Sequence, residues 1–201
     1  MKDQASKLRT MVSESNTKDR LRIFSVISNS DNVGKTNYIM NLAVKFRKNG
    51  ENVLVMDATG DSENLSNYIN LSSIGIIDDN LESFNNIQDQ IIMGPEGIDI
   101  LLGAENLIGI KTLTKEKQNQ ALYKIKFFNK YDVIIIDNKA GFNDDLLCFL
   151  NFTNEIILIS TPDIENILST YGLIKVLSLN KIKSDMNIVI NKTKSAEEGL
   201  E

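Results

Sequence analysis

Residues 28–37 read SNSDNVGKTN, and this stretch decides how the chain is interpreted. It ends in VGKT, between a run apolar enough for a buried strand and a segment with helical spacing, which is the ending of a phosphate-binding loop. In such a loop, backbone N–H groups face the phosphates, the lysine reaches the outer phosphates and the threonine ligates magnesium. The alternative is an ordinary strand-to-helix turn with an exposed lysine. The predicted nucleotide-binding residues are Asn29, Ser30, Asp31, Asn32, Val33, Gly34, Lys35, Thr36 and Asn37.

The first half of this loop departs from the usual glycine-rich composition, because Asn29, Asp31 and Asn32 stand there. Asn and Asp are the non-glycine residues that most readily adopt positive φ, so we expect them to trace a similar path at some energetic cost. Asp31 also opposes the ligand, since a carboxylate about 6 Å from a phosphate is repelled by a few kcal/mol at an intermediate dielectric. The loop is therefore expected to bind nucleotide weakly.

Apolar strands alternate with amphipathic helices along the chain. Strands are predicted over residues 22–28, 52–57, 131–137, 154–161 and 186–191. Helices are predicted over 37–50 and 164–177, two short strands around a turn at 95–97, and mostly helix over 105–130. This order is typical of the α/β class, with a doubly wound, mostly parallel sheet and helices on both faces. Ligands of such sheets bind at the carboxyl ends of the strands, where we find Ser28, Asp57, Asp137, Thr161 and Asn191.

Composition argues against several classes of function. The 201-residue chain has a formal net charge of −5, which argues against nucleic-acid binding through a cationic face. It contains no histidine, so a Ser–His or Cys–His nucleophile and an imidazole zinc site are excluded. Its single cysteine, Cys148, is expected to be a small buried hydrophobe, and one cysteine suits a reducing compartment.

Membrane association lacks support in the sequence. No apolar run reaches the length of a membrane span, and the N-terminus MKDQASKLRT is too polar for a signal peptide. The final residues, KTKSAEEGLE, are polar and show no amphipathic helix. We therefore expect a cytoplasmic protein.

The chain resembles the deviant P-loop ATPases of the MinD/ParA superfamily. Five stretches carry the resemblance in order and spacing: SNSDNVGKTN, VLVMDATGDSENL, YDVIIIDNKAGF, ISTPDIENILSTYGLIKVL and IVIN. Within that superfamily, the start MKDQASKLRTMV is similar to that of flagellar number and placement regulators of the FlhG/FleN type, which carry an Asp-Gln-Ala-x-x-Leu-Arg element. The residues that match this element are Asp3, Gln4, Ala5, Leu8 and Arg9.

The N-terminal resemblance implies partners. It implies that the element acts on FlhF, a partner GTPase of the signal-recognition-particle type, and that the protein works with flagellar basal-body components. The superfamily resemblance also implies a possible nucleotide-dependent homodimer. We predict that residues 1–20 form an amphipathic segment with a polar tether, and that residues 21–201 form a C-terminally short P-loop domain.

The superfamily resemblance also implies a ligand, ATP or ADP with Mg²⁺, and a role for each polar residue of the site. Lys35 and Thr36 would serve the phosphates and the magnesium. Asp57 and Asp137 would hold the metal through water, unless these carboxylates only cap the following segments. Asn191 would bind the adenine edge.

Two positions depart from the family pattern. The family's loop has a lysine that crosses a dimer interface to the partner's phosphates, and that position is Ser30 here. A second aspartate that orients the attacking water is replaced by Thr59, and Asp61 would need a different loop path to substitute for it. We therefore expect nucleotide binding with weak or absent hydrolysis, and assign no catalytic residue. The alternatives are an active ATPase whose cycle drives dimerisation, and a nucleotide-free scaffold that acts through its N-terminal helix.

Overall fold

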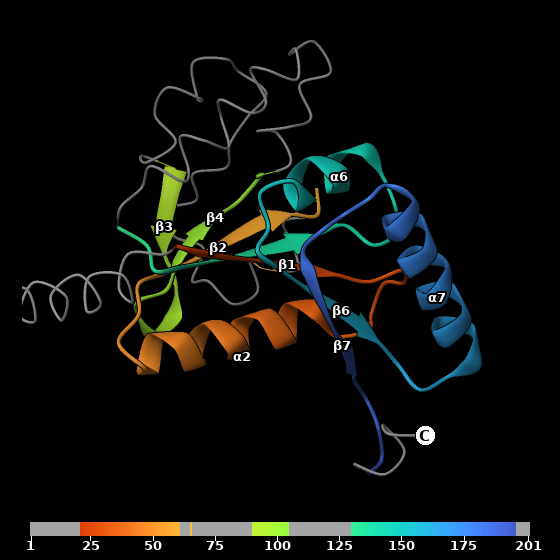
Figure 1. Cartoon of the computed structure of the whole chain (residues 1–201). Helices are drawn as coiled ribbons and strands as arrows, with labels where there is room; N and C mark the ends of the chain where they lie inside the picture. The colour runs from red at the N-terminus through yellow and green to blue at the C-terminus, as the bar shows by residue number, and fades with distance from the viewer. Residues whose placement is uncertain (1–20, 61–64, 66–89, 105–129, 196–201) are drawn as a thin grey trace, which may run out of the picture.

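The computed structural model (Figure 1) describes residues 21–60, 65, 90–104 and 130–195. The described strands form one seven-stranded sheet in the order β3-β4-β2-β5-β1-β6-β7, in which β3 alone runs antiparallel to its neighbour. This confirms the predicted α/β class and the doubly wound, mostly parallel sheet. The elements are β1 (Arg22–Ile27), α2 (Lys35–Lys48), β2 (Val53–Ala58), β3 (Ile91–Met93), the 3-10 turn η2 (Pro95–Gly97), β4 (Asp99–Leu101), β5 (Val133–Asn138), α6 (Asp144–Leu150), β6 (Glu155–Ser160), α7 (Ile164–Leu179) and β7 (Asp185–Ile190).

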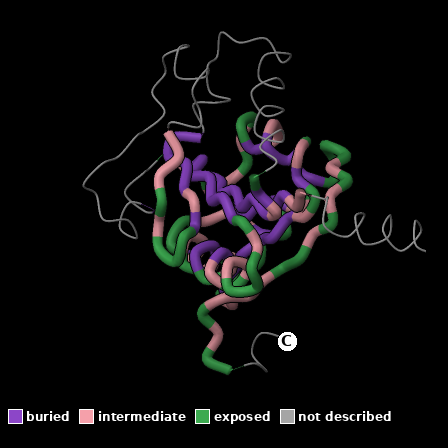
Figure 2. Tube along the Cα trace, turned by 90° about the vertical axis from the view of Figure 1, so that its left-hand side faces the viewer, coloured by how far each residue is buried: buried purple, intermediate pink, exposed green. Residues whose placement is uncertain are grey.

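Helices cover both faces of the sheet, which explains why its central strands are apolar throughout. On one face, α2 packs through Ile39, Met40 and Ala43 against alternate residues of β1, β2 and β5. On the other face, Phe149 of α6 and Leu173 of α7 pack against the remaining set of alternate residues. Figure 1 shows α2 and α6 on opposite sides of the strands, and Figure 2 shows the buried strands at the centre of the molecule.

The register of the central strands brings the polar residues to one end of the sheet. β5 lies between β1 and β2, and Asp57 of β2 is paired directly with Asp137 of β5. On the other side of β5, the chain leaves β1 after Ile27 and enters the loop that leads to α2. Thr161 and Asn191 follow the ends of β6 and β7. The predicted gathering of polar residues at the carboxyl ends of the strands is confirmed.

Three local predictions need correction. α2 begins at Lys35 instead of Asn37, because Gly34 caps it in a left-handed conformation (φ 90°). The sequence patterns miss α6, a short helix whose first turn donates a backbone N–H to Oδ1 of Asn143 at 2.7 Å. Cys148, on α6, packs against the core cluster beneath this helix but is only half-buried, so it is less buried than predicted.

β7 is the edge strand at the α7 side of the described sheet. None of its six residues is buried, whereas all six residues of β2 are. β7 pairs with β6 along its length, and Met186 packs beneath α7. β7 is therefore held by one neighbour, and its outer side is open within the described part of the chain.

Some predictions lie outside the described residues. These are the N-terminal segment over residues 1–20 and, apart from its last residue, the helix over 105–130. Among the residues that the structure does describe, no helix is both long and apolar enough to cross a membrane.

Candidate functional site

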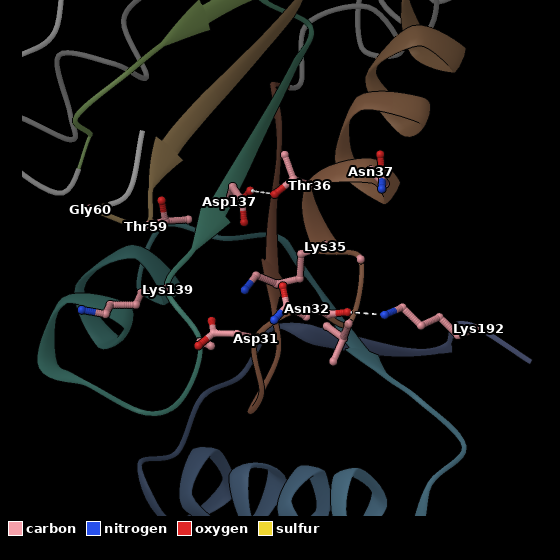
Figure 3. Close-up of a pocket in the computed structure, with 13 residues that line it drawn as sticks. Asp31, Asn32, Lys35, Thr36, Asn37, Thr59, Gly60, Asp137, Lys139 and Lys192 are labelled. Carbon is pink, nitrogen blue, oxygen red and sulfur yellow. Dashed lines mark hydrogen bonds between the residues drawn. The ribbon is translucent and has the colours of Figure 1, made fainter. Parts of the chain in front are cut away.

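The loop after β1 turns sharply before it enters α2 (Figure 3). Asn32 (φ 57°) and Gly34 (φ 90°) take left-handed conformations, whereas Asn29 and Asp31 do not. The expectation of positive φ therefore holds for Asn32 and is wrong for the other two polar residues. The loop follows its path with two left-handed residues, at the positions where Asn and Gly tolerate that conformation best.

Gly34 is required at the junction of the loop and α2 for two reasons. Its backbone is left-handed, and a Cβ atom placed on it would lie only 2.5 Å from Nδ2 of Asn191. That nitrogen donates a hydrogen bond to the carbonyl oxygen of Val33 at 2.8 Å. The predicted site residue Asn191 is therefore brought to the loop, and its amide nitrogen holds the loop backbone.

The N-terminus of α2 is open to an anion. Gly34 caps the helix without a side-chain hydrogen bond, and the first turn, which includes Asn37, contains no acidic residue. The first N–H groups of a helix have no partner within it, and together with the helix dipole they attract negative charge. This part of the loop is suited to binding a phosphate group.

Lys35 is half-buried beside the loop. Its Nζ donates to Oγ of Ser28 at 3.1 Å. Burial lowers the pKa of Lys35, while the charges of Asp137, Asp31 and Asp57 act in the opposite direction. A bound phosphate would favour the charged form of this lysine further, because an opposite charge within a few ångströms offsets the loss of solvation.

Thr36 and Asp137 are in direct contact in the lining of the pocket. Oγ1 of Thr36 donates to Oδ2 of Asp137 at 2.9 Å. The other carboxylate oxygen, Oδ1, is buried and has no hydrogen-bond partner among the described residues. Burial raises the pKa of Asp137 to about 6 despite Lys35 and the Thr36 hydroxyl, which lower it, and Asp57 adds to the rise. A buried carboxylate oxygen of this kind is costly unless a cation or a donor supplies its partner.

Asp57 lies buried at the same level as Asp137. Its Oδ1 accepts hydrogen bonds from the backbone nitrogen of Thr59 at 3.0 Å and from Oγ1 of Thr59 at 2.7 Å. The described ranges contain no group of three or more His, Cys, Asp or Glu residues that could hold a metal ion. A Mg²⁺ ion would therefore need Thr36 and the two carboxylates together with water and phosphate oxygens, which are the ligands that magnesium takes in nucleotide sites. The residues present fit a magnesium–nucleotide ligand.

Most of these groups line one cavity of about 790 Å³, which is within the usual range for small-molecule sites. Figure 3 shows Lys35, Asp31 and Thr36 facing this cavity from the loop and from α2. Residues 31–37, Thr59 and Asp137 line it. Four predicted or implied site residues are not part of the lining: Asn29, Ser30, Asp57 and Asn191.

The sequence interpretation misses two lysines that line the same cavity, Lys139 and Lys192. Nζ of Lys192 donates to the carbonyl oxygen of Asn32, so the end of β7 holds the loop at a second point. Lys139 follows Asp137 by two residues, and Lys192 directly follows Asn191. A lysine within two residues of a predicted polar strand end, as after Asp137 and after Asn191, is the sequence signal that would have identified them.

The predicted partner-binding residues lie outside the described part of the chain. Their role in binding a GTPase stays a prediction, and so does the division of the chain at residue 20. These residues are Asp3, Gln4, Ala5, Leu8 and Arg9.

Residues 24–201 match the family model of the CobQ/CobB/MinD/ParA nucleotide binding domain. Similar curated proteins include antiactivator FleN of Pseudomonas aeruginosa, 25% identical over 182 residues, and the flagellum site-determining protein YlxH of Helicobacter pylori, 26% identical over 206 residues. The alignments cover 89% and 99% of this chain, which spans 64% and 69% of the length of these relatives.

Solved structures share the fold. The septum site-determining protein MinD of Pyrococcus horikoshii, complexed with Mg-ADP, matches with a TM-score of 0.69 and 25% identity, over 90% of this chain and 74% of that chain. A plasmid partition protein of Borrelia burgdorferi bound to AMPPNP matches with a TM-score of 0.71 and 19% identity, over 90% and 78% of the two chains. The second likeness shows the fold alone.

The loop assignment predicts opposite effects of two substitutions on nucleotide affinity. Lys35→Ala should weaken the binding of Mg-ADP about tenfold or more, because it removes a charged hydrogen-bond donor from the phosphates. Asp31→Gly should tighten binding by removing repulsion. Titration calorimetry measures both, with Lys45→Ala on the exposed side of α2 as a control for the loss of one charge. An unchanged affinity in Lys35→Ala would show that the loop is wrongly assigned.

Asp137→Asn should stabilise the ligand-free protein at neutral pH. Because the pKa of Asp137 in the folded protein is about 6, above its value of about 3.9 in an unfolded chain, this group lowers the free energy of unfolding as the pH rises from about 4 to about 6. The gain on substitution is at most about 3 kcal/mol, and it is partial because Lys35 loses a facing carboxylate. Thermal unfolding at pH 7 and pH 4.5 measures it, and a variant less stable than the parent at pH 7 would contradict the expected burial penalty.

Proposed function

The chain belongs to the CobQ/CobB/MinD/ParA nucleotide-binding domain family, and on that basis we propose that it is a nucleotide-binding regulator of flagellar number and placement. Nucleotide binding is supported by one observation above all, the convergence of Lys35, Thr36 and Asp137 on one cavity at the start of α2. The flagellar role is supported by similarity to an antiactivator and to a flagellum site-determining protein.

The proposed ligand is ATP or ADP with Mg²⁺. The phosphates would lie at the N-terminus of α2 with Lys35 beside them, and Thr36, Asp57 and Asp137 would hold the metal directly or through water. The metal would supply positive charge next to the outer phosphates. Asn191 is bound to the loop through its amide nitrogen, and we propose that the same side chain contacts the adenine edge. The MinD structure with Mg-ADP supports this choice of ligand.

We propose that hydrolysis is weak or absent. Ser30 carries no charge, and its carbonyl oxygen accepts a hydrogen bond from Oγ of Ser28 at 2.7 Å. The hydroxyl of Thr59 donates to Oδ1 of Asp57, and a neutral hydroxyl engaged in this way is a poor base for an attacking water. The chain would then act through its nucleotide-bound and nucleotide-free states more than through turnover.

The proposed partners follow from the N-terminal element and from the family. A GTPase of the FlhF type would bind residues 3–9, and basal-body components would bind elsewhere on the chain. A homodimer that forms around the nucleotide is proposed as the assembled state.

The proposal of weak hydrolysis predicts that a phosphate-release assay on the full chain finds no useful turnover. Removing one fixed charge that stabilises a transition state typically costs about 10²–10³ in rate, and removing the group that positions the water costs roughly 10²–10⁴. Ser30→Lys combined with Thr59→Asp should therefore raise the rate, and adding Lys35→Ala should abolish the gain. Robust hydrolysis by the unmodified chain, lost in Lys35→Ala, would favour the active-ATPase alternative.

The proposed GTPase contact predicts that deletion of residues 1–20 abolishes binding to an FlhF-type GTPase while leaving Mg-ADP binding intact. Gln4→Ala and Arg9→Ala in the full chain should weaken the contact, because both side chains belong to the element. Lys7→Ala, which removes a charge at a position that the element leaves variable, is the matched control. Surface-immobilised GTPase measures binding, and equal binding by the truncated and full chains would overturn the assignment.

A further inference from the structure

Lys139 lines the cavity and has no role in the proposed function. It lies on the segment between β5 and α6, two residues after Asp137. Its side chain is exposed, and it lines the same cavity as Lys35 and Thr36. In Figure 3, Lys139 and Lys192 lie on opposite sides of Lys35.

The three lysines of the cavity differ in what their ammonium groups contact. Nζ of Lys35 donates to Ser28, and Nζ of Lys192 donates to the carbonyl oxygen of Asn32. Lys139 makes no hydrogen bond or ion pair within the part of the chain that the structure describes. It is therefore the cavity lysine that can engage a ligand without giving up an existing contact.

The backbone that carries Lys139 is fixed relative to the phosphate loop. The neighbouring Asn138 is buried, and its Nδ2 donates to the carbonyl oxygen of Val26 on β1 at 3.2 Å. Two residues after Lys139, the backbone nitrogen of Gly141 donates to the carbonyl oxygen of Ser28 at 2.9 Å. Both contacts tie this segment to the strand from which the loop starts. Lys139 therefore has a flexible side chain on a backbone that is held next to the loop.

Under the proposed function, a nucleotide would lie in the cavity in one orientation. Asn191 and Lys192, on the β7 side, mark the end where the adenine would lie, and the phosphates would run along the loop past Lys35. Thr59, Gly60 and Lys139 also line the cavity, and in Figure 3 they lie on the side away from Lys192. A third phosphate would extend toward this side. Because Asp137 also faces the cavity there, the added negative charge of that phosphate would be unfavourable unless a positive group paired with it.

We propose that Lys139 binds the terminal phosphate of a nucleoside triphosphate, and that it thereby makes the site prefer a triphosphate over a diphosphate. This inference rests on the proposed nucleotide-binding function. In Figure 3 the ammonium group of Lys139 points away from Asp31, and a long flexible stem lets it turn toward a ligand. Lys139 leaves the inner phosphates to Lys35 and to α2, so its contribution is confined to the third phosphate.

Titration calorimetry on the full chain, with Mg-ADP and with the magnesium complex of the non-hydrolysable ATP analogue AMPPNP, tests the proposal. Lys139→Ala should weaken AMPPNP binding about tenfold to a hundredfold, the range of a lost charged hydrogen bond, and change ADP binding less than about twofold. Lys139→Arg should retain most of the preference. Lys183→Ala, at an exposed lysine outside the lining of the cavity, controls for net charge.

The outcomes separate this inference from the proposed function. Equal weakening of both nucleotides in Lys139→Ala, or no weakening of either, overturns the role of Lys139 while Lys35→Ala still reports on the loop. Failure of the unmodified chain to bind either nucleotide overturns the proposed function and this inference together. The unfolding temperature of ligand-free Lys139→Ala should match that of the parent, because the side chain is exposed and makes no contact that the fold needs.

Discussion

The properties of the candidate site depend on the burial of opposite charges at the end of an apolar sheet. Asp137 lies near the end of β5, and Lys35, the first residue of α2, contacts Ser28 just after β1. Burial disfavours the charged form of each group, lowering the pKa of the lysine and raising that of the aspartate. Each charge offsets part of the other's cost, and neither is fully compensated. A ligand that brings both negative phosphates and a divalent cation relieves both groups at once. The packing that buries the ends of the strands therefore also leaves the charges of Lys35 and Asp137 only partly compensated.

The sheet was the most predictable part of the molecule, because the apolar runs that end in Asp57 and Asp137 specify buried parallel strands with polar ends. α6 was missed because its seven residues are too few to show helical periodicity. The contact of Asn191 with Val33 joins residues 158 positions apart, and no local pattern encodes it. The roles of Lys139 and Lys192 likewise depend on where the strand ends meet in space. The left-handed path of the loop was predicted by residue type, but type alone did not say which of its polar residues would adopt it.

The composition of the site differs from one built around a single glycine-rich loop. The loop contributes one lysine and one carboxylate to the cavity, and the positive charges beyond Lys35 come from the segments after β5 and β7. These segments are connected to the loop by hydrogen bonds to its backbone or to the end of β1. Distribution of the charge over three segments keeps Lys35, Lys139 and Lys192 apart from one another while all three still face one cavity.

The attachment of the loop to β7 has a consequence for local unfolding. β7 is an edge strand of the described sheet and has no buried residue, and edge elements of this kind open at a lower free energy than the central strands of a sheet. Each local opening at the C-terminal end of β7 would break the hydrogen bonds that Asn191 and Lys192 make to the backbone of the loop. A ligand that binds only when these hydrogen bonds hold the loop therefore stabilises the paired state of β7 by its binding free energy. The amide protons of this strand, which lie away from the phosphates, would exchange with solvent more slowly as the site fills.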